Sequence, residues 1–447
     1  MELSGQKVLV IGMGATGVAA ASFLGAKGAL VRAVDEKAPS LWGEGFAKLA
    51  LQPWMSVQPE HAEALAGIDL VVPSPGIPPQ HAMLVAAQKK GIPILSEIEL
   101  AYRFIQVPII AVTGTNGKTT TTTLLGEILS GAGKKIFVGG NIGTPLIAYA
   151  GSAQEDDFVV AEISSFQLQW IETFRPRAAV LLNITCDHVN YHGSFDEYRR
   201  IKARIFENQQ STDLAILNND DDLQKGLAPT LKASVEYFSS QASLKTGIFI
   251  DGREIVYARS GGRAERYPLN MIRLPGLHNA ENVMAAIIAA RFCGVVPESI
   301  VDTVSDFRGL AHRIEFAGEK NAVKFYDDSK GTNVDAVVRA LKTFAGPVIL
   351  LLGGRDKDGD FETLRPLLHG KVRSLVLFGE ARDRIESLIG DAAPMVKEAT
   401  LREAVARAYL LALPGDVVLL SPGCASFDEF ANYKERGNTF KKVVGTL

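Results

Sequence analysis

The sequence predicts an α/β protein built from three domains. Short runs of β-branched and apolar residues alternate with segments of helical periodicity along the 447 residues, which is typical of parallel sheets covered by helices. Two strand–helix turns are rich in glycine, at residues 12–17 and 114–119, and a further series of strands begins after residue 310. We expect domains at residues 1–96, 97–309 and 310–447.

The composition excludes several classes of protein. A hydrophobic fraction of 47% and a charged fraction of 22% are ordinary for a globular chain in water. The net charge of −3 offers no basic surface for nucleic acid or an anionic membrane. The three cysteines are scattered and form no Cys-x-x-Cys pair, which argues against a disulfide framework or a zinc ribbon. We therefore expect a cytoplasmic protein with no nucleic-acid or membrane partner.

The N-terminus contains a stretch that could be mistaken for an export signal or a membrane segment. No charged residue occurs between Lys7 and Lys27. The stretch contains four glycines, however, and a strand with charged residues follows at 30–35. A buried strand, turn and helix explain both observations, so we expect no export signal.

The first domain opens with a dinucleotide-type fingerprint. A strand at 7–11 leads into a complete G-x-G-x-x-G at 12–17, which includes Gly14. Asp35 ends the next strand, where the fingerprint places a ribose-binding carboxylate. The pattern predicts a Rossmann-like domain and, taken alone, an NAD-dependent oxidoreductase. The same turn also suits any other diphosphate ligand, because it recognises the pyrophosphate.

A second turn of this domain follows the predicted strand 68–72. It contains Ser74 and Gly76, which lie where a strand's carboxyl end would present a hydroxyl and an N–H group to a ligand. A plain proline-rich loop is the alternative.

A phosphate-binding loop opens the central domain. The apolar strand 109–113 is followed by the residues Gly114, Thr115, Asn116, Gly117, Lys118, Thr119 and Thr120. Backbone N–H groups of such a turn, together with the helix N-terminus, bind phosphates. Lys118 would reach the β- and γ-phosphates, and the Thr119 hydroxyl would hold Mg²⁺. The match to G-x-x-x-x-G-K-[ST] is imperfect, because the first glycine would fall at Val112; a glycine-rich turn without nucleotide is the alternative.

Two more strand ends of the central domain carry polar groups. Glu162 ends the buried strand 157–162 and is a Mg²⁺ candidate, because hard cations prefer oxygen ligands. The segment 186–192, after the strand 178–184, contains two histidines and an aspartate that either bind metal or cap a loop.

Two helices complete the central domain. The helix at 194–206 contains Lys202, for which a solvated side chain is the simplest interpretation. A later helix begins near residue 277 and places Asn279 and Asn282 on one side.

The C-terminal domain is predicted to be a second Rossmann-like sheet. Strands are expected at 323–326, 348–352, 375–378 and 417–420. Polar turns follow them, and ligands of open α/β sheets gather at that edge.

Several segments, taken with the order of the three domains, resemble the Mur ligases of peptidoglycan synthesis over essentially the whole chain. They are Asn279-Ala280-Glu281-Asn282, Leu310-Ala311-His312-Arg313-Ile314-Glu315 and Asp328-Ser329-Lys330-Gly331-Thr332-Asn333. The compact loop 114–119 is similar to that family's ATP loop, which accounts for the misplaced glycine.

Within the family, the segments 353–357 and 421–428 are most similar to those of the D-glutamate-adding members. The chain lacks the Asp-Asn-Pro-Arg string of diaminopimelate-adding members and the Gln-Pro-His-Arg string of L-alanine-adding ones. The resemblance implies a monomeric ligase that uses ATP and two Mg²⁺ ions. Its small-molecule substrates would be UDP-N-acetylmuramoyl-L-alanine and D-glutamate, joined through an acyl phosphate.

The resemblance also implies roles for individual residues. The UDP-substrate would contact Gly14, Asp35, Glu36, Lys37, Ser74, Pro75, Gly76, Ile77 and Asn141. ATP would contact the loop residues 114–120 together with Asn279, Asn282, Arg313, Asp328 and Lys330. D-Glutamate would contact Thr332, Lys357, Ser426 and Phe427. The catalytic and metal-binding set would be Lys118, Thr119, Glu162, His188 and Lys202.

The resemblance further places a carbamylated lysine at Lys202. A lysine beside Ile201 and one turn before Phe206 is expected to point partly inward, where desolvation favours the neutral amine that reacts with CO₂. The family's Asp-His-x-Asp stands here as Asp187-His188-Val189-Asn190, so Asn190 lacks the carboxylate that the family places there.

Three other functions stay open at this stage. An NAD-dependent oxidoreductase explains only the first domain, and a non-catalytic nucleotide sensor explains only the phosphate loop. Folate polyglutamylation shares the ATP-binding and C-terminal domains, but the fingerprint from Gly12 to Asp35 followed by Ser74-Pro75-Gly76 favours a UDP-sugar.

Overall fold

The computed structural model describes residues 1–42, 45–259 and 261–447, without the side chains of Leu41 and Asn190. Its contacts divide the chain into two compact units, each described here by itself. Unit 1 comprises residues 1–184, 188–271 and 281–305; unit 2 comprises 185–187, 272–280 and 306–447. None of the described helices is long and apolar enough to cross a membrane.

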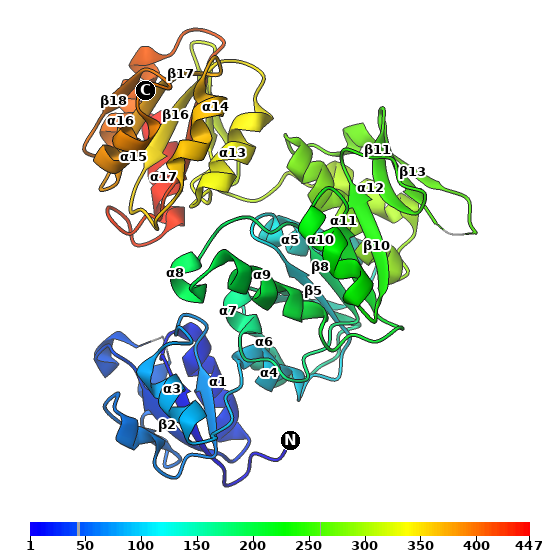
Figure 1. Cartoon of the computed structure of the whole chain (residues 1–447), viewed down its shortest axis with the longest axis vertical. Coiled ribbons are helices and arrows are strands. Elements are labelled where there is room, and N and C mark those ends of the chain that lie inside the picture. Colours follow the sequence, from blue (N-terminus) through cyan, green and yellow to red (C-terminus); the bar gives the residue numbers. More distant parts are fainter. Residues whose placement is uncertain (43–44, 260) are drawn as a thin grey trace. The chain divides into compact units, whose positions relative to one another are not determined.

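The N-terminal sheet of unit 1, drawn in blue in Figure 1, contains four strands. They are parallel, in the order β3-β2-β1-β4. Its elements are β1 (Lys7–Ile11), α1 (Ala15–Ala26), β2 (Leu30–Val34), α2 (Phe46–Leu49), β3 (Met55–Val57), β4 (Leu70–Pro73) and α3 (Ala82–Lys89). Alternate residues of β1 enter different cores: Val8 packs in the cluster that contains α1, and Leu9 in the cluster that contains α3. Helices therefore cover both faces, as expected for a Rossmann-like sheet.

The central sheet has nine strands, in the order β13-β12-β11-β10-β9-β8-β5-β7-β6. The strands are β5 (Ile109–Thr113), β6 (Ile136–Gly140), β7 (Phe158–Glu162), β8 (Ala178–Leu181), β9 (Leu214–Asn218), β10 (Ser234–Ser239), β11 (Gly247–Asp251), β12 (Glu254–Ala258) and β13 (Glu265–Pro268). The strands from β6 to β11 pair in parallel, and β12 and β13 add an antiparallel edge. The antiparallel edge was not predicted from the sequence.

Helices of the central region connect and cover this sheet. They are α4 (Glu97–Tyr102), α5 (Lys118–Gly131), α6 (Leu146–Ala150), α7 (Ser165–Leu168), α8 (Val189–His192), α9 (Phe195–Ala203), α10 (Asp222–Leu227), α11 (Leu277–Phe292) and α12 (Pro297–Asp306). One continuous core joins Phe23 of α1 to Ile147 of α6, so the two sheets of unit 1 share buried apolar surface. The boundary that we placed at residue 96 stays a prediction.

Unit 2 contains a six-stranded sheet with the order β14-β15-β19-β16-β17-β18. Its elements are β14 (Glu315–Lys320), β15 (Val323–Asp327), α13 (Val334–Thr343), β16 (Val348–Gly353), α14 (Arg365–Leu368), β17 (Val372–Phe378), α15 (Arg382–Ile389), β18 (Met395–Lys397), α16 (Leu401–Leu411), β19 (Val417–Gly423) and α17 (Tyr433–Val444). Only β14 pairs in antiparallel fashion. Leu350 of β16 packs in the core with α13 and α15, and its neighbour Ile349 packs in the core with α16 and α17. The predicted α/β class is confirmed.

Candidate active site

The phosphate loop lies between the carboxyl end of β5 and the first turn of α5. Gly114 and Gly117 have φ angles of +150° and +87°, which side chains with a Cβ rarely adopt. A Cβ at Gly117 would also lie 2.3 Å from Oδ1 of Asn282. The amide of Asn282, near the start of α11, therefore lies against the loop.

Asn183 forms hydrogen bonds with the phosphate loop. Its backbone oxygen accepts the Thr115 N–H at 2.9 Å, and its side-chain amide exchanges two hydrogen bonds with the backbone of Asn116. The sequence placed Asn183 within a strand, but β8 ends at Leu181, because the chain turns there to bond the loop. A single asparagine after a strand gave no sequence signal for this contact.

Lys118 folds back over the loop. Its Nζ donates to the carbonyl oxygens of Gly114 at 2.8 Å and Thr115 at 2.9 Å. The amine therefore lies against the loop whose backbone N–H groups can bind phosphate.

Lys202 is buried, with 1% of its surface exposed. Its Nζ donates to the same Gly114 oxygen at 2.8 Å and lies 4.8 Å from the ring centre of Tyr198. The Tyr198 hydroxyl in turn shares a hydrogen bond of 3.1 Å with Oγ1 of Thr115. The interpretation of Lys202 as a solvated lysine is wrong, because α9 turns this residue inward with Tyr198 and Ile201. The role of Tyr198 in this arrangement was missed.

Glu162 lies at the same sheet edge, because β7 pairs with β5 and places Glu162 beside Val112. The side chain is buried, and its Oε1 accepts a hydrogen bond of 2.7 Å from Asn141. Its Oε2 is buried without a hydrogen-bond partner among the described residues. A buried carboxylate oxygen in this condition fits a divalent cation, which would supply the missing partner.

His188 precedes α8 with a φ of +53°, and its ring packs edge-on against Phe166 at 4.7 Å. In the described part of the chain, the groups of three or more His, Cys, Asp or Glu with close ligand atoms lie elsewhere, so His188 and Glu162 belong to no such group. The side chain of Asn190 lies outside the described residues.

The two predicted ligand turns of the N-terminal sheet meet each other. Ser74 donates to the Gly12 oxygen at 2.6 Å, and a Cβ at Gly17 would lie 1.9 Å from that oxygen. Both oxygens of Asp35 accept backbone N–H groups, from Met13 at 2.5 Å and from Lys37 at 2.9 Å. The Asp35 carboxylate therefore orders the glycine turn.

The rest of the predicted UDP set lies around these turns. Glu36, Lys37 and Gly76 are exposed, and Pro75 and Ile77 are half-buried. The Tyr191 hydroxyl donates to the Pro75 and Ile77 oxygens at 3.2 and 2.9 Å, which ties the turn to the segment after β8.

In unit 2, Asp328 follows β15 and accepts a hydrogen bond of 2.7 Å from Ser421. Burial raises the pKa of this carboxyl to about 7, although Ser421 and the charge of Arg313 oppose the rise. Lys330 lies beside it, with its Nζ 4.1 Å from the ring centre of Tyr433. Asn279 donates from its side chain to the Pro275 oxygen at 2.7 Å.

The four residues predicted for D-glutamate lie on turns after strands of unit 2. Ser426 is buried, Phe427 is 62% exposed and Thr332 is half-buried. Nζ of Lys357 lies 3.9 Å from Oδ1 of Asp187. No hydrogen bond joins these four side chains among the described residues.

Sequence reasoning missed the residue that joins these turns. Arg436 of α17 is fully buried and donates to the oxygens of Ser329, Cys424 and Ala425. Burial lowers its pKa to about 10. A single arginine on an amphipathic helix carried no signal that it points inward.

The comparison with protein families covers most of the chain. The Mur ligase MurD-like N-terminal domain matches residues 6–96, the Mur ligase middle domain matches 112–290, and the Mur ligase glutamate ligase domain matches 312–424. The chain belongs to the Mur ligase family.

Curated relatives of this Mur ligase match it over its full length. A protein of Syntrophus aciditrophicus named UDP-N-acetylmuramoylalanine–D-glutamate ligase is 56% identical over 99% of this chain and 98% of its own. A protein of the same name from Geobacter metallireducens is 46% identical over 100% and 99% of the two chains.

Solved structures share the fold at lower identity. The UDP-N-acetylmuramate–alanine ligase of Thermotoga maritima is 19% identical with a TM-score of 0.59, and the match covers 98% of this Mur ligase and 99% of that chain. The pseudomurein peptide ligase type C of Methanothermus fervidus is 16% identical with a TM-score of 0.62, covering 99% and 100%.

Proposed function

We propose that this Mur ligase joins D-glutamate to UDP-N-acetylmuramoyl-L-alanine with hydrolysis of ATP to ADP and phosphate, in cytoplasmic peptidoglycan precursor synthesis. The observation that carries the proposal is the 56% identity, over 99% of the chain, with a relative named for this activity. ATP phosphorylates the alanyl carboxylate, the D-glutamate amine attacks the acyl phosphate, and phosphate leaves as the amide forms.

Phosphate release tests this function directly. The purified chain is given ATP, Mg²⁺ and UDP-N-acetylmuramoyl-L-alanine, with D- and L-amino acids supplied one at a time. Release that depends on both D-glutamate and the UDP-substrate supports the proposal. Release with L-glutamate and a folate acceptor, or with another amino acid in preference to D-glutamate, contradicts it.

The proposed ATP site is built on the phosphate loop. N–H groups of the loop bind the phosphates, and Lys118 moves from the Gly114 and Thr115 oxygens to the γ-phosphate. Asn282 lies against the loop, where it can meet the nucleotide. In unit 2 we assign Asn279, Arg313, Asp328 and Lys330 to the same nucleotide.

Mg²⁺ fits the donor set of unit 1. Glu162 offers its unpartnered Oε2, and Thr119 and His188 complete the proposed ligands. When bound, the ions neutralise charge that develops on the transferred phosphoryl group. Asn141 holds Oε1 of Glu162 and so fixes the direction of Oε2.

We also propose that Lys202 is carbamylated in the active enzyme. Two lysine amines, those of Lys118 and Lys202, donate to the single carbonyl oxygen of Gly114. Two positive charges this close in a buried place repel each other. The neutral amine of Lys202 adds to CO₂ with release of a proton, and the resulting anion replaces this repulsion with attraction and can bind Mg²⁺ or orient its ligands.

The carbamate is tested with Lys202→Ala. We expect severe loss of kcat that acetate or formate partly restores, because a small carboxylate can occupy the vacated anion site. The control is Lys225→Ala, which removes an exposed lysine and should respond to neither anion. Native mass spectrometry should show an added CO₂ that acid removes. Full activity of Lys202→Ala, or active enzyme in bicarbonate with an unmodified Lys202, contradicts the assignment.

A further inference from the structure

A hollow of about 450 Å³ opens at the edge of the central sheet opposite the phosphate loop. Ile109 and Phe158, which begin β5 and β7, line it, and so does Arg177, which precedes β8. The phosphate loop follows the other end of β5, so the length of the strand, roughly 16 Å, separates the two places. The hollow is therefore distinct from the proposed ligase site of unit 1.

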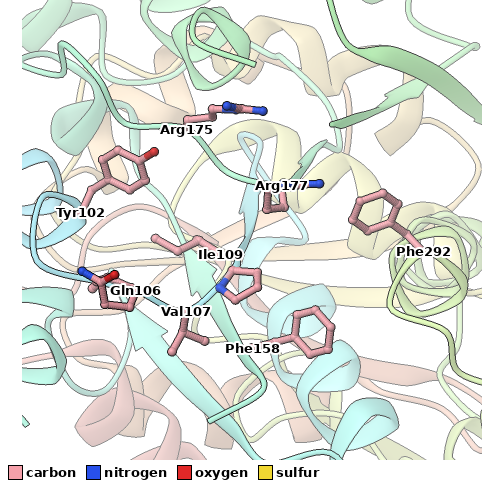
Figure 2. Close-up of a pocket in the computed structure, with 10 residues that line it drawn as sticks. Tyr102, Gln106, Val107, Ile109, Phe158, Arg175, Arg177 and Phe292 are labelled. Atoms are coloured by element: carbon pink, nitrogen blue, oxygen red, sulfur yellow. The ribbon is translucent and has the colours of Figure 1, made fainter. Parts of the chain in front are cut away.

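The lining divides into an apolar side and a basic side (Figure 2). The apolar side consists of Ile105, Val107, Pro108, Ile109, Phe158 and Phe292, and Gln106 adds one polar side chain beside Val107. The basic side consists of Arg175 and Arg177, with Tyr102 beside them. Figure 2 shows the Tyr102 hydroxyl turned toward Arg175, the ring of Phe158 below the arginines and the ring of Phe292 to the right of Arg177.

The two arginines share one counter-ion. Nε of Arg175 lies 2.6 Å from one oxygen of Asp213, and Nε of Arg177 lies 3.0 Å from the other. In the part of the chain that the structure describes, Asp213 is the one carboxylate that forms ion pairs with either arginine. Asp213 is buried, whereas Arg175 and Arg177 are 32% and 46% exposed, so a net positive charge faces the hollow.

The hydroxyl of Tyr102 adds a hydrogen-bonding group to this charge. It forms no hydrogen bond with any described residue, and its half-buried ring faces the hollow. A guanidinium binds a carboxylate oxygen strongly even when one of its edges is already used, and a phenol can donate to the same anion. The aromatic rings of Phe158 and Phe292 suit the face of a flat apolar group.

We propose that this hollow binds a small molecule with one carboxylate on a flat aromatic body. The carboxylate would lie against Arg175, Arg177 and the Tyr102 hydroxyl, and the aromatic body between Phe158 and Phe292. A volume of about 450 Å³ is within the range of small-molecule sites and suits two fused rings. Neither ATP nor the proposed amino-acid substrate has this shape.

Binding is tested by titrating the full chain into 1-naphthoate and measuring the fluorescence anisotropy of 1-naphthoate. We expect saturable binding with a Kd below about 1 mM. Acetate lacks the aromatic rings and 1-naphthalenemethanol lacks the carboxylate, so each should bind at least about tenfold more weakly. ADP with UDP-N-acetylmuramoyl-L-alanine should leave the affinity unchanged, because the sites are separate.

Substitutions of residues that line the hollow test where the ligand binds. Arg177→Ala and Phe292→Ala should each weaken the binding of 1-naphthoate at least about tenfold, because the first removes a charge and the second removes an aromatic ring. Arg266→Ala removes another exposed, ion-paired arginine of the same unit and should leave binding unchanged. Each variant should keep ligase turnover, which shows that it is folded. No saturable binding by the wild type, equal binding of the alcohol, competition by the ligase ligands, or full binding by Arg177→Ala overturns the proposal.

Discussion

The Gly114 carbonyl oxygen is the smallest feature on which the proposed chemistry depends. It accepts hydrogen bonds from Lys118 at the start of α5 and from Lys202 in α9. ATP would compete for Lys118 only, because Lys202 is buried beneath Tyr198. The two lysines therefore have different proposed tasks although they share an acceptor.

Replacement of Lys118 by alanine should reduce kcat at least about 100-fold, or about 3 kcal/mol of transition-state stabilisation, because its charge offsets that on the γ-phosphate. The loss of its two hydrogen bonds to loop carbonyls should lower the free energy of unfolding by only about 1–2 kcal/mol. Steady-state kinetics and urea unfolding measure the two effects. Lys135→Ala, which removes an exposed lysine, is the control. More than about a tenth of wild-type kcat in Lys118→Ala would contradict the role.

At this scale, residues of a local strand–turn–helix pattern could be predicted, and residues whose contacts join distant segments could not. Glu162 and the loop glycines were found because strand–turn–helix patterns are local in sequence. Asn183 and Arg436 were not found, because their contacts join segments that only the folded chain brings together. The inward direction of Lys202 was expected only in part.

Among the elements, α4 contains an unusual buried charge. Glu97 is the first residue of this helix, is 1% exposed and accepts the Ile147 N–H of α6 at 2.7 Å. Burial raises the pKa of Glu97 to about 7, and hydrogen bonds from Ile147 and Gln167 oppose the rise only in part. The carboxyl is therefore protonated in the folded state at a pH where it would ionise in the unfolded chain.

The sign of the pH effect follows from this raised pKa. Between the ordinary value of 4.5 and about 7 the folded state holds a proton that the unfolded state releases, so stability falls as pH rises across this range. Glu97→Gln keeps the acceptor oxygen and cannot ionise. We expect it to match wild type at pH 4.5 and to exceed it by up to roughly 3 kcal/mol at pH 8. Urea unfolding at both pH values measures this, and a constant difference between the two proteins would contradict it. The exposed Glu63→Gln is the control.

Some element boundaries differ from the predicted ones. The strand expected at 68–72 is β4, Leu70–Pro73. Asp69 precedes it and still pairs with Lys7, because its N–H donates to the Lys7 oxygen and its carboxylate accepts the Lys7 N–H, both at 2.8 Å. The hairpin edge of β12 and β13 was missed, since its short strands show no strict alternation. The alternation of strands and helices along the chain was predicted because it depends on local periodicity alone.

At the scale of the whole molecule, the proposed reaction uses all three predicted domains, and ATP would contact residues of both the central and the C-terminal domain. UDP-substrate, ATP and amino acid would bind at the strand ends of three separate sheets, and the positions of those sheets along the chain match the three Mur ligase domains. The boundaries, the monomeric state and the cytoplasmic location stay predictions.

Selectivity for D-glutamate over L-glutamate is expected from unit 2. The side-chain carboxylate would lie against Lys357 and the hydroxyls of Thr332 and Ser426, so inversion at Cα misplaces either the amine or this carboxylate. Lys357→Ala should raise KM for D-glutamate at least about tenfold, because it removes the charged partner. The control is Lys342→Ala, on the exposed face of α13. Equal turnover of both enantiomers, or an unchanged KM in Lys357→Ala, would contradict this assignment.

The position of β5 in its sheet has a consequence for how the protein is made. This strand pairs with β7 on one side and β8 on the other, and both follow it in sequence. Both edges of β5 lack their partners until the ribosome has synthesised β7, and one edge lacks its partner until β8 follows, whereas the N-terminal strands already have theirs. A nascent chain that ends before β7 should therefore aggregate more readily than one that ends after β8, unless a chaperone covers it. The strand that leads into the phosphate loop is thus paired on both sides only after β8 has been synthesised.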